Sequence, residues 1–61
     1  MNMSATEIIN RIDSAKREYN SARDGSVATD MLVDNAMYEL DTAIRLLVKM
    51  GILPAEALKA I

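Results

Sequence analysis

Two segments of this chain place apolar residues three and four positions apart, and this spacing constrains the fold more than any other feature. The apolar positions are Ile8, Ile9, Ile12, Ala15, Tyr19 and Ala22 in the first segment, and Leu32, Val33, Ala36, Met37, Leu40, Ala43, Ile44, Leu47 and Val48 in the second. Because an α-helix turns once every 3.6 residues, each set lies along one helix face. The β-branched residues do not alternate, so no strands are expected. The spacing predicts an all-α protein.

Capping residues mark the ends of the expected helices. Ser4 followed by Glu7 is a capping box, which typically begins a helix. Gly25 and Gly51 are typical helix stops, and Pro54 is favoured at the first position of a further helix. We therefore predict one helical-hairpin domain over residues 1–61. Its helices are expected at about 5–23, about 28–50 and about 54–60.

The turn between the two long helices is short, which makes them antiparallel neighbours. Ser26 and Thr29 can each cap the second helix, and the sequence does not choose between them. A chain of 61 residues buries only about 60% of its unfolded surface. It has no Cys or His, so disulfides and the usual zinc ligands are excluded as sources of stability. We expect a homo-oligomer: a dimeric four-helix bundle first, a larger assembly second.

Apolar residues outside the main stripe gather toward the C-terminal part of the chain. They are Leu46, Met50, Ile52, Leu53, Leu58 and Ile61. Left exposed, they would form a patch typical of an interaction surface. We predict that these six residues make the oligomer interface.

Charge and hydropathy exclude several classes of function. The net charge is −2 with both signs interspersed, which disfavours binding to nucleic acid or to an anionic membrane. The apolar runs are far shorter than the roughly 20 residues that span a bilayer. The N-terminal segment has neither the basic nor the apolar part of a signal peptide. A cytoplasmic location without membrane contact is expected.

Catalytic residue types are scarce in this sequence. Without His or Cys, the usual nucleophile–base pairs cannot form, and the two glycines do not make a phosphate-binding loop. Asp30, Asp34 and Asp41 share one helix face and could bind Mg²⁺ or Ca²⁺. We interpret them instead as a solvated acidic face that the helix dipole favours. We therefore expect no metal, no cofactor and no catalytic residue, although enzymatic activity stays open.

Three residues of the second helix are the candidate partner-binding residues. Asp41 borders the apolar stripe, where a bound partner would partly desolvate its carboxylate, and Asp34 lies on the same face. Tyr38 is typical of an interface, with its ring packed and its hydroxyl in water, although a ligand-stacking role is an alternative. Asp34, Tyr38 and Asp41 are thus predicted to contact another protein. The methionines Met31 and Met50 could add an adaptable apolar contact surface.

The stretch from Ile12 to Ile44 resembles a known family. Residues 12–20 read Ile-Asp-Ser-Ala-Lys-Arg-Glu-Tyr-Asn, similar to a family pattern of Ile-acidic-x-x-basic-x-x-Leu-Asn, and a glycine turn follows. Residues 37–41 read Met-Tyr-Glu-Leu-Asp, where that family has Ser-Gln-Glu-Leu-Asp, and the aliphatic residue three places on is Ile44. The family comprises small helical-hairpin phosphatases that act on an aspartyl-phosphorylated sporulation response regulator. The resemblance implies a hairpin fold and, if the activity is shared, an essential Asp41 at the regulator's phosphorylation site. Met37 and Tyr38 replace the polar Ser-Gln pair.

A second resemblance is to phage-encoded helical hairpins that sequester cyclic-nucleotide immune signals. It rests on residues 34–37 and on Ala43 and Ile44, and it identifies no pocket residues. Our leading hypothesis is a non-enzymatic, oligomeric helical hairpin that binds a partner protein and regulates or inhibits it, in a phage or mobile-element setting. The alternatives are the aspartyl-phosphate phosphatase and a sponge for a small nucleotide signal.

Overall fold

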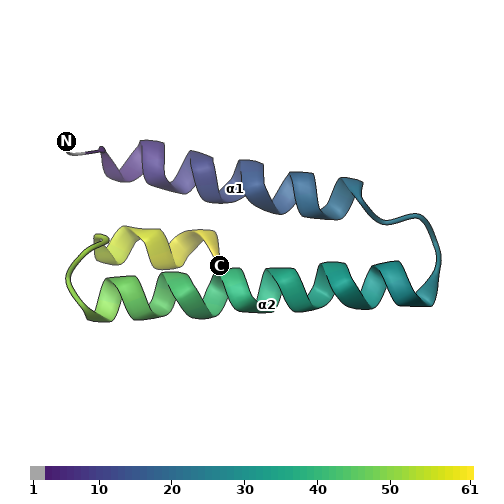
Figure 1. Ribbon diagram of the computed structural model, residues 1–61. Coiled ribbons are helices and arrows are strands. Elements are labelled where there is room, and N and C mark those ends of the chain that lie inside the picture. The colour runs from purple at the N-terminus through teal and green to yellow at the C-terminus, as the bar shows by residue number, and fades with distance from the viewer. Residues whose placement is uncertain (1–2) are drawn as a thin grey trace.

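The structure is a computed structural model, and it describes residues 3–61. It contains two α-helices, α1 (Ala5–Ser21) and α2 (Val27–Lys49), followed by a 3₁₀ helix, η1 (Ala55–Ala60). The long helices run antiparallel, and η1 folds back between them at the end away from the turn (Figure 1). The predicted all-helical class is confirmed, and the described part of the chain has no strand.

The start of α1 agrees with the sequence, but its end does not. The Ser4 hydroxyl accepts a hydrogen bond from the Glu7 backbone N–H at 3.1 Å, as a helix cap should. At the other end α1 stops at Ser21, before the predicted residue 23. The Arg23 N–H bonds the carbonyl of Asn20, three residues back, which tightens the backbone beyond the last α-helical turn. The predicted stop at Gly25 is therefore wrong, because Gly25 lies farther along, within the turn.

The turn is held by side chains that bond its own backbone. Ser26 caps α2, with its hydroxyl accepting from the Thr29 N–H at 3.2 Å, so the choice between the two candidate caps falls on Ser26. Asp24 accepts from the Ser26 N–H at 2.9 Å and from the Thr29 hydroxyl at 3.3 Å. Gly25 has a φ of +83°, a left-handed conformation that suits glycine. These contacts fix where α2 begins.

The end of α2 follows the predicted glycine stop. Gly51 has a φ of +77°, and its N–H bonds the Val48 carbonyl at 3.0 Å. The Ile52 N–H bonds the Leu47 carbonyl at 2.9 Å, which completes a Schellman motif. Pro54 then precedes η1 as its cap, with extended backbone, and is not its first helical residue as predicted.

The hydrophobic core is small and lies where the three helices meet. Ile8 and Ile12 of α1, Ile44 of α2 and Ala57 of η1 are its buried members. The half-buried residues packed against them are Leu40, Val48, Leu53, Ala60 and Ile61. Ala57 has no exposed surface at all, and its small side chain lets η1 approach both long helices closely. The short helix therefore completes the core of the hairpin.

The molecule exposes more surface than a compact chain of its size. Its accessible surface is 4575 Å² for a mass of 6.7 kDa, whereas about 3900 Å² is typical of a folded monomer of that mass. Its radius of gyration is 12.8 Å, against roughly 10.5 Å for a compact domain of this length. The rod-like shape, 38 × 19 × 18 Å, accounts for both differences.

Candidate interaction surface

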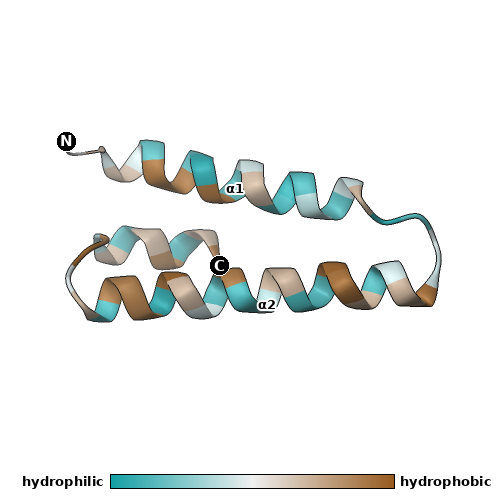
Figure 2. Cartoon of the chain, viewed as in Figure 1, coloured by the Kyte–Doolittle hydropathy of each residue, from teal (hydrophilic) through white to brown (hydrophobic). Residues whose placement is uncertain are grey.

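The side of α2 that faces away from the core carries a row of exposed apolar side chains. We call this row the outer face, and it consists of Val27, Met31, Tyr38, Leu46 and Met50. Each of the five is between 55% and 76% exposed. At roughly 100° of rotation per residue, the five span an arc of about 140° centred opposite Val33 and Ile44, the two buried residues of α2. The exposed Glu39 and Lys49 lie within the same arc. Apolar residues accordingly recur along the whole length of α2 (Figure 2).

An apolar outer face is unusual for a surface helix. A helix that buries one side normally presents charged and polar residues on the other, whereas an apolar residue on both sides indicates burial on both. Leu32 is a further exposed apolar residue of α2. The sequence placed it on the buried stripe, whereas the structure leaves it 69% exposed. That prediction is wrong because the contact with α1 and η1 is narrower than the apolar stripe. The outer face thus has the character of an interaction surface.

Sequence reasoning recognised only part of this face. It selected Tyr38, Leu46 and Met50 and raised Met31, but it did not select Val27. A usable signal was present, since these five residues recur at helical spacing on the side opposite the main stripe. A second apolar stripe on one helix is therefore a sequence-level indication of a second packing partner.

The three predicted partner-binding residues differ in their surroundings. Tyr38 is 73% exposed and belongs to the outer face. Asp34 is exposed but forms an ion pair and hydrogen bond with Arg23. Asp41 is half-buried and faces Lys16 of α1. Of the three, only Tyr38 therefore belongs to the outer face, whereas the two carboxylates pair with cations of their own chain.

The Lys16–Asp41 ion pair links the two long helices. The Lys16 ammonium lies 3.4 Å from Asp41 Oδ1, and the two side chains are 21% and 33% exposed. That oxygen is buried and accepts no hydrogen bond within the described residues, so the lysine charge is its compensation. The predicted desolvation of Asp41 is thus produced by α1 of the same chain. Action of Asp41 on a phosphorylated regulator would require Lys16 to release it.

Arg23 neutralises the other two carboxylates of the predicted acidic face. Its guanidinium contacts Asp34 and lies 4.0 Å from Asp30 Oδ1, while its Nε donates to Asn20 Oδ1 at 3.0 Å. The hydrogen bond to Asp34 raises the pKa of Arg23 against the lowering effect of desolvation, and attraction to both carboxylates adds to the rise. Within residues 3–61 no three acidic side chains are grouped as a metal site would need.

The predicted oligomer interface divides into two parts. Leu46, Met50, Ile52 and Leu58 are exposed. Leu53 and Ile61 instead pack against the core of their own chain. The C-terminal apolar residues are therefore used partly within the monomer, and the remaining exposed ones adjoin the end of the outer face.

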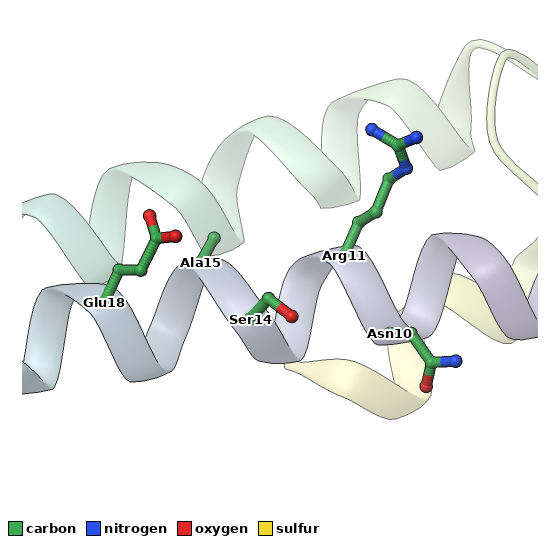
Figure 3. A pocket seen from close by; sticks show the side chains of 5 residues that line it. All are labelled: Asn10, Arg11, Ser14, Ala15 and Glu18. Atoms are coloured by element: carbon green, nitrogen blue, oxygen red, sulfur yellow. The ribbon is translucent and has the colours of Figure 1, made fainter.

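A shallow depression on α1 is the other surface feature of note. It is lined by Asn10, Arg11, Ser14, Ala15 and Glu18, all from one helix. Figure 3 shows Arg11 and Glu18 projecting on the side of α1 toward α2, while Asn10 points away from them. The polar groups do not converge on one point as they do in a ligand site.

No family model, no curated protein and no solved structure matches this chain. The functional interpretation therefore rests on the chain's own residues. Among residues 3–61, no helix is both long enough and apolar enough to cross a membrane.

Proposed function

We propose that this chain is a non-enzymatic helical interaction protein of the cytoplasm, which binds another protein through the outer face of α2 and thereby regulates or inhibits it. The observation that carries the proposal is the exposed apolar row from Val27 to Met50 on a helix whose opposite side already forms the core. An exposed row of this kind is typical of protein–protein contact surfaces.

The residue types on the outer face also support protein binding. Tyr38 lies at the middle of α2, and tyrosine is among the residues that most often dominate interface energies. Met31 and Met50 flank it with flexible, polarisable side chains that adapt to irregular partner surfaces. An amphipathic helix of this kind commonly lies in an apolar groove of its partner.

The charged residues between α1 and α2 pair with one another inside the chain, which agrees with a protein that acts by occupying a partner's surface. The Lys16 ammonium pairs with the Asp41 carboxylate, and the Arg23 guanidinium pairs with Asp30 and Asp34. These charges therefore stabilise the hairpin itself and leave the apolar row as its most distinctive surface.

A photo-crosslinking experiment tests this function. A benzophenone amino acid replaces Tyr38 on the outer face or, as the matched control, the exposed Glu18 of α1. In cells of the source organism, we expect the Tyr38 position to give a defined adduct with another protein and the Glu18 position to give none. With that protein purified, Tyr38→Ala should weaken binding about 30-fold, as a central aromatic contact does. Equal labelling from both positions, or binding unaffected by Tyr38→Ala, would refute the proposal.

A further inference from the structure

The peptide bond between Asp24 and Gly25 lies in the exposed turn between α1 and α2. The Ser26 N–H donates to Asp24 Oδ1 at 2.9 Å, so the aspartate side chain folds back over its own backbone. The ring closed by this hydrogen bond includes both the carboxyl carbon of Asp24 and the backbone nitrogen of Gly25. The turn therefore holds an electrophilic carbon and a nucleophilic nitrogen near each other, which favours a reaction between them.

The Gly25 nitrogen is open to such a reaction. Its N–H donates no hydrogen bond to any group within residues 3–61. Glycine has no side chain to shield the nitrogen, and a Cβ placed at Gly25 would meet nothing within 4 Å. The other aspartates of the chain all lie inside helices, where the following N–H bonds a carbonyl four residues back. They are Asp13, Asp30, Asp34 and Asp41.

We propose that Asp24–Gly25 is a modification site, at which the chain isomerises from a normal aspartyl linkage to an isoaspartyl linkage. In the first step, the Gly25 nitrogen bonds the carboxyl carbon of neutral, protonated Asp24. The N–H proton and the acid proton leave with Oδ2 as one water molecule, and Oδ1 stays as a carbonyl oxygen of the cyclic imide. In the second step, water adds to the main-chain carbonyl of Asp24 and breaks its bond to the Gly25 nitrogen. Gly25 is then attached through the former side chain.

The hydrogen-bond donors of the turn act on the reacting carboxyl group. The Ser26 N–H bonds the oxygen that stays, where negative charge develops as the nitrogen adds, and a fixed donor at that point stabilises the charge. The Thr29 hydroxyl bonds Oδ2, the leaving oxygen, at 3.3 Å. The same hydrogen bonds, those from Ser26 first, lower the pKa of Asp24. Little of the neutral acid is therefore present at neutral pH, and the conversion is slow.

Isomerisation loosens the start of α2. It inserts the Cβ of Asp24 into the main chain and moves the free carboxylate onto Cα, away from the Ser26 N–H and the Thr29 hydroxyl. These contacts fix the turn that leads into Val27, the first residue of α2 and of the outer face. Losing contacts at a helix start should lower the melting temperature of so small a domain by roughly 4–8 °C. A synthetic isoaspartyl form that melts at the temperature of the original chain would overturn this consequence.

Peptide mapping of the aged protein tests the site. The native chain and the same chain unfolded in guanidinium chloride are incubated at neutral pH, digested, and analysed for isoaspartate by chromatography and by labelling with an isoaspartyl methyltransferase. Asp13, which precedes Ser14 inside α1, is the control within the chain, because it reacts only when the helix opens. Folding should slow isomerisation less than about tenfold at Asp24 and more than about a hundredfold at Asp13. Equal protection of the two aspartates would overturn the proposal.

Asp24→Asn gives a second, independent measurement. The asparagine carbonyl oxygen can keep the hydrogen bond from the Ser26 N–H, and the amide nitrogen takes the place of Oδ2 and leaves as ammonia. Folding of the variant is checked first by circular dichroism. We expect the folded variant to lose its amide and to give both aspartate and isoaspartate at position 24. A folded variant that keeps its amide while the unfolded variant loses it would overturn the proposal, because the turn would then not present the Gly25 nitrogen.

Discussion

Shortening Ile44 should nearly unfold the protein, whereas the same change two residues away should not. Ile44 is 3% exposed and belongs to the core cluster, whose buried members come from all three helices. Leu46 is 55% exposed on the outer face. Replacing either by alanine removes the same number of carbon atoms, so the two variants differ only in where the atoms are lost.

The expected magnitude follows from burial. Truncating a buried isoleucine to alanine costs about 2–5 kcal/mol, through lost burial and the cavity left behind. A core this small supplies roughly 3–5 kcal/mol in total. If the substitution removes about 3.5 kcal/mol from a free energy of unfolding of about 4 kcal/mol, about 0.5 kcal/mol remains. That value corresponds to roughly two folded molecules for each unfolded one. Leu46→Ala should change the free energy of unfolding by no more than about 0.5 kcal/mol.

Urea denaturation followed by far-ultraviolet circular dichroism measures this difference. At a few micromolar protein, the midpoint should fall from about 4 M in the unchanged chain to below about 1 M in Ile44→Ala, for a slope near 1 kcal/mol/M. Leu46→Ala should keep the original midpoint. Equal losses in the two variants would show that the core does not lie between α2, α1 and η1, and would refute the reasoning.

Three further outcomes follow from the turn and from the contacts between the helices. Gly51→Ala should cost about 1 kcal/mol and lower the melting temperature by roughly 4–8 °C, because alanine is strained at positive φ although its methyl meets open space; Gly51→Asn should lose less. Hydrogen bonds from the Ser26 side chain and N–H lower the pKa of Asp24, and Thr29 adds to the effect. The ionised Asp24 therefore stabilises the fold fully above its ordinary pKa of 3.8, and this stabilisation is lost as the pH falls through the lower pKa of the folded state. Thermal melts from neutral pH to about pH 2 should therefore be flatter at the acid end for Asp24→Asn. A double-mutant cycle of Lys16→Met and Asp41→Asn should give a coupling of about 0.2–1 kcal/mol that shrinks in high salt, and a coupling near zero would show that the ion pair does not stabilise the hairpin.

Features set by neighbouring residues were predictable from the sequence. Ser4 and Gly51 act through hydrogen bonds to backbone groups a few positions away, so their patterns located one start and one stop. The sequence pattern placed the end of α1 too late. The backbone already tightens after Ser21, before the chain reaches Gly25. A glycine that permits a left-handed turn need not be the residue that ends a helix.

Features set by packing between distant segments were not predictable. The sequence placed Leu53 and Ile61 on an oligomer surface, whereas the insertion of η1 between the long helices turns both toward the core. The partner of Asp41 depends on the register of α1 against α2, which a single sequence does not specify. That Asp34 and Asp41 share one face of α2 could be predicted from their spacing, but their ion pairs could not.

The position of η1 also determines when the fold can be completed. Ala57 and Ile8 belong to the same core cluster, so the core joins segments separated by most of the described chain. The hairpin of α1 and α2 has few buried contacts of its own before η1 arrives, and closing so long a loop is the slow, entropically costly step. During synthesis, both long helices leave the ribosome before residues 55–60 do. Until η1 folds back, the isoleucines that it covers stay exposed to solvent together with the outer face.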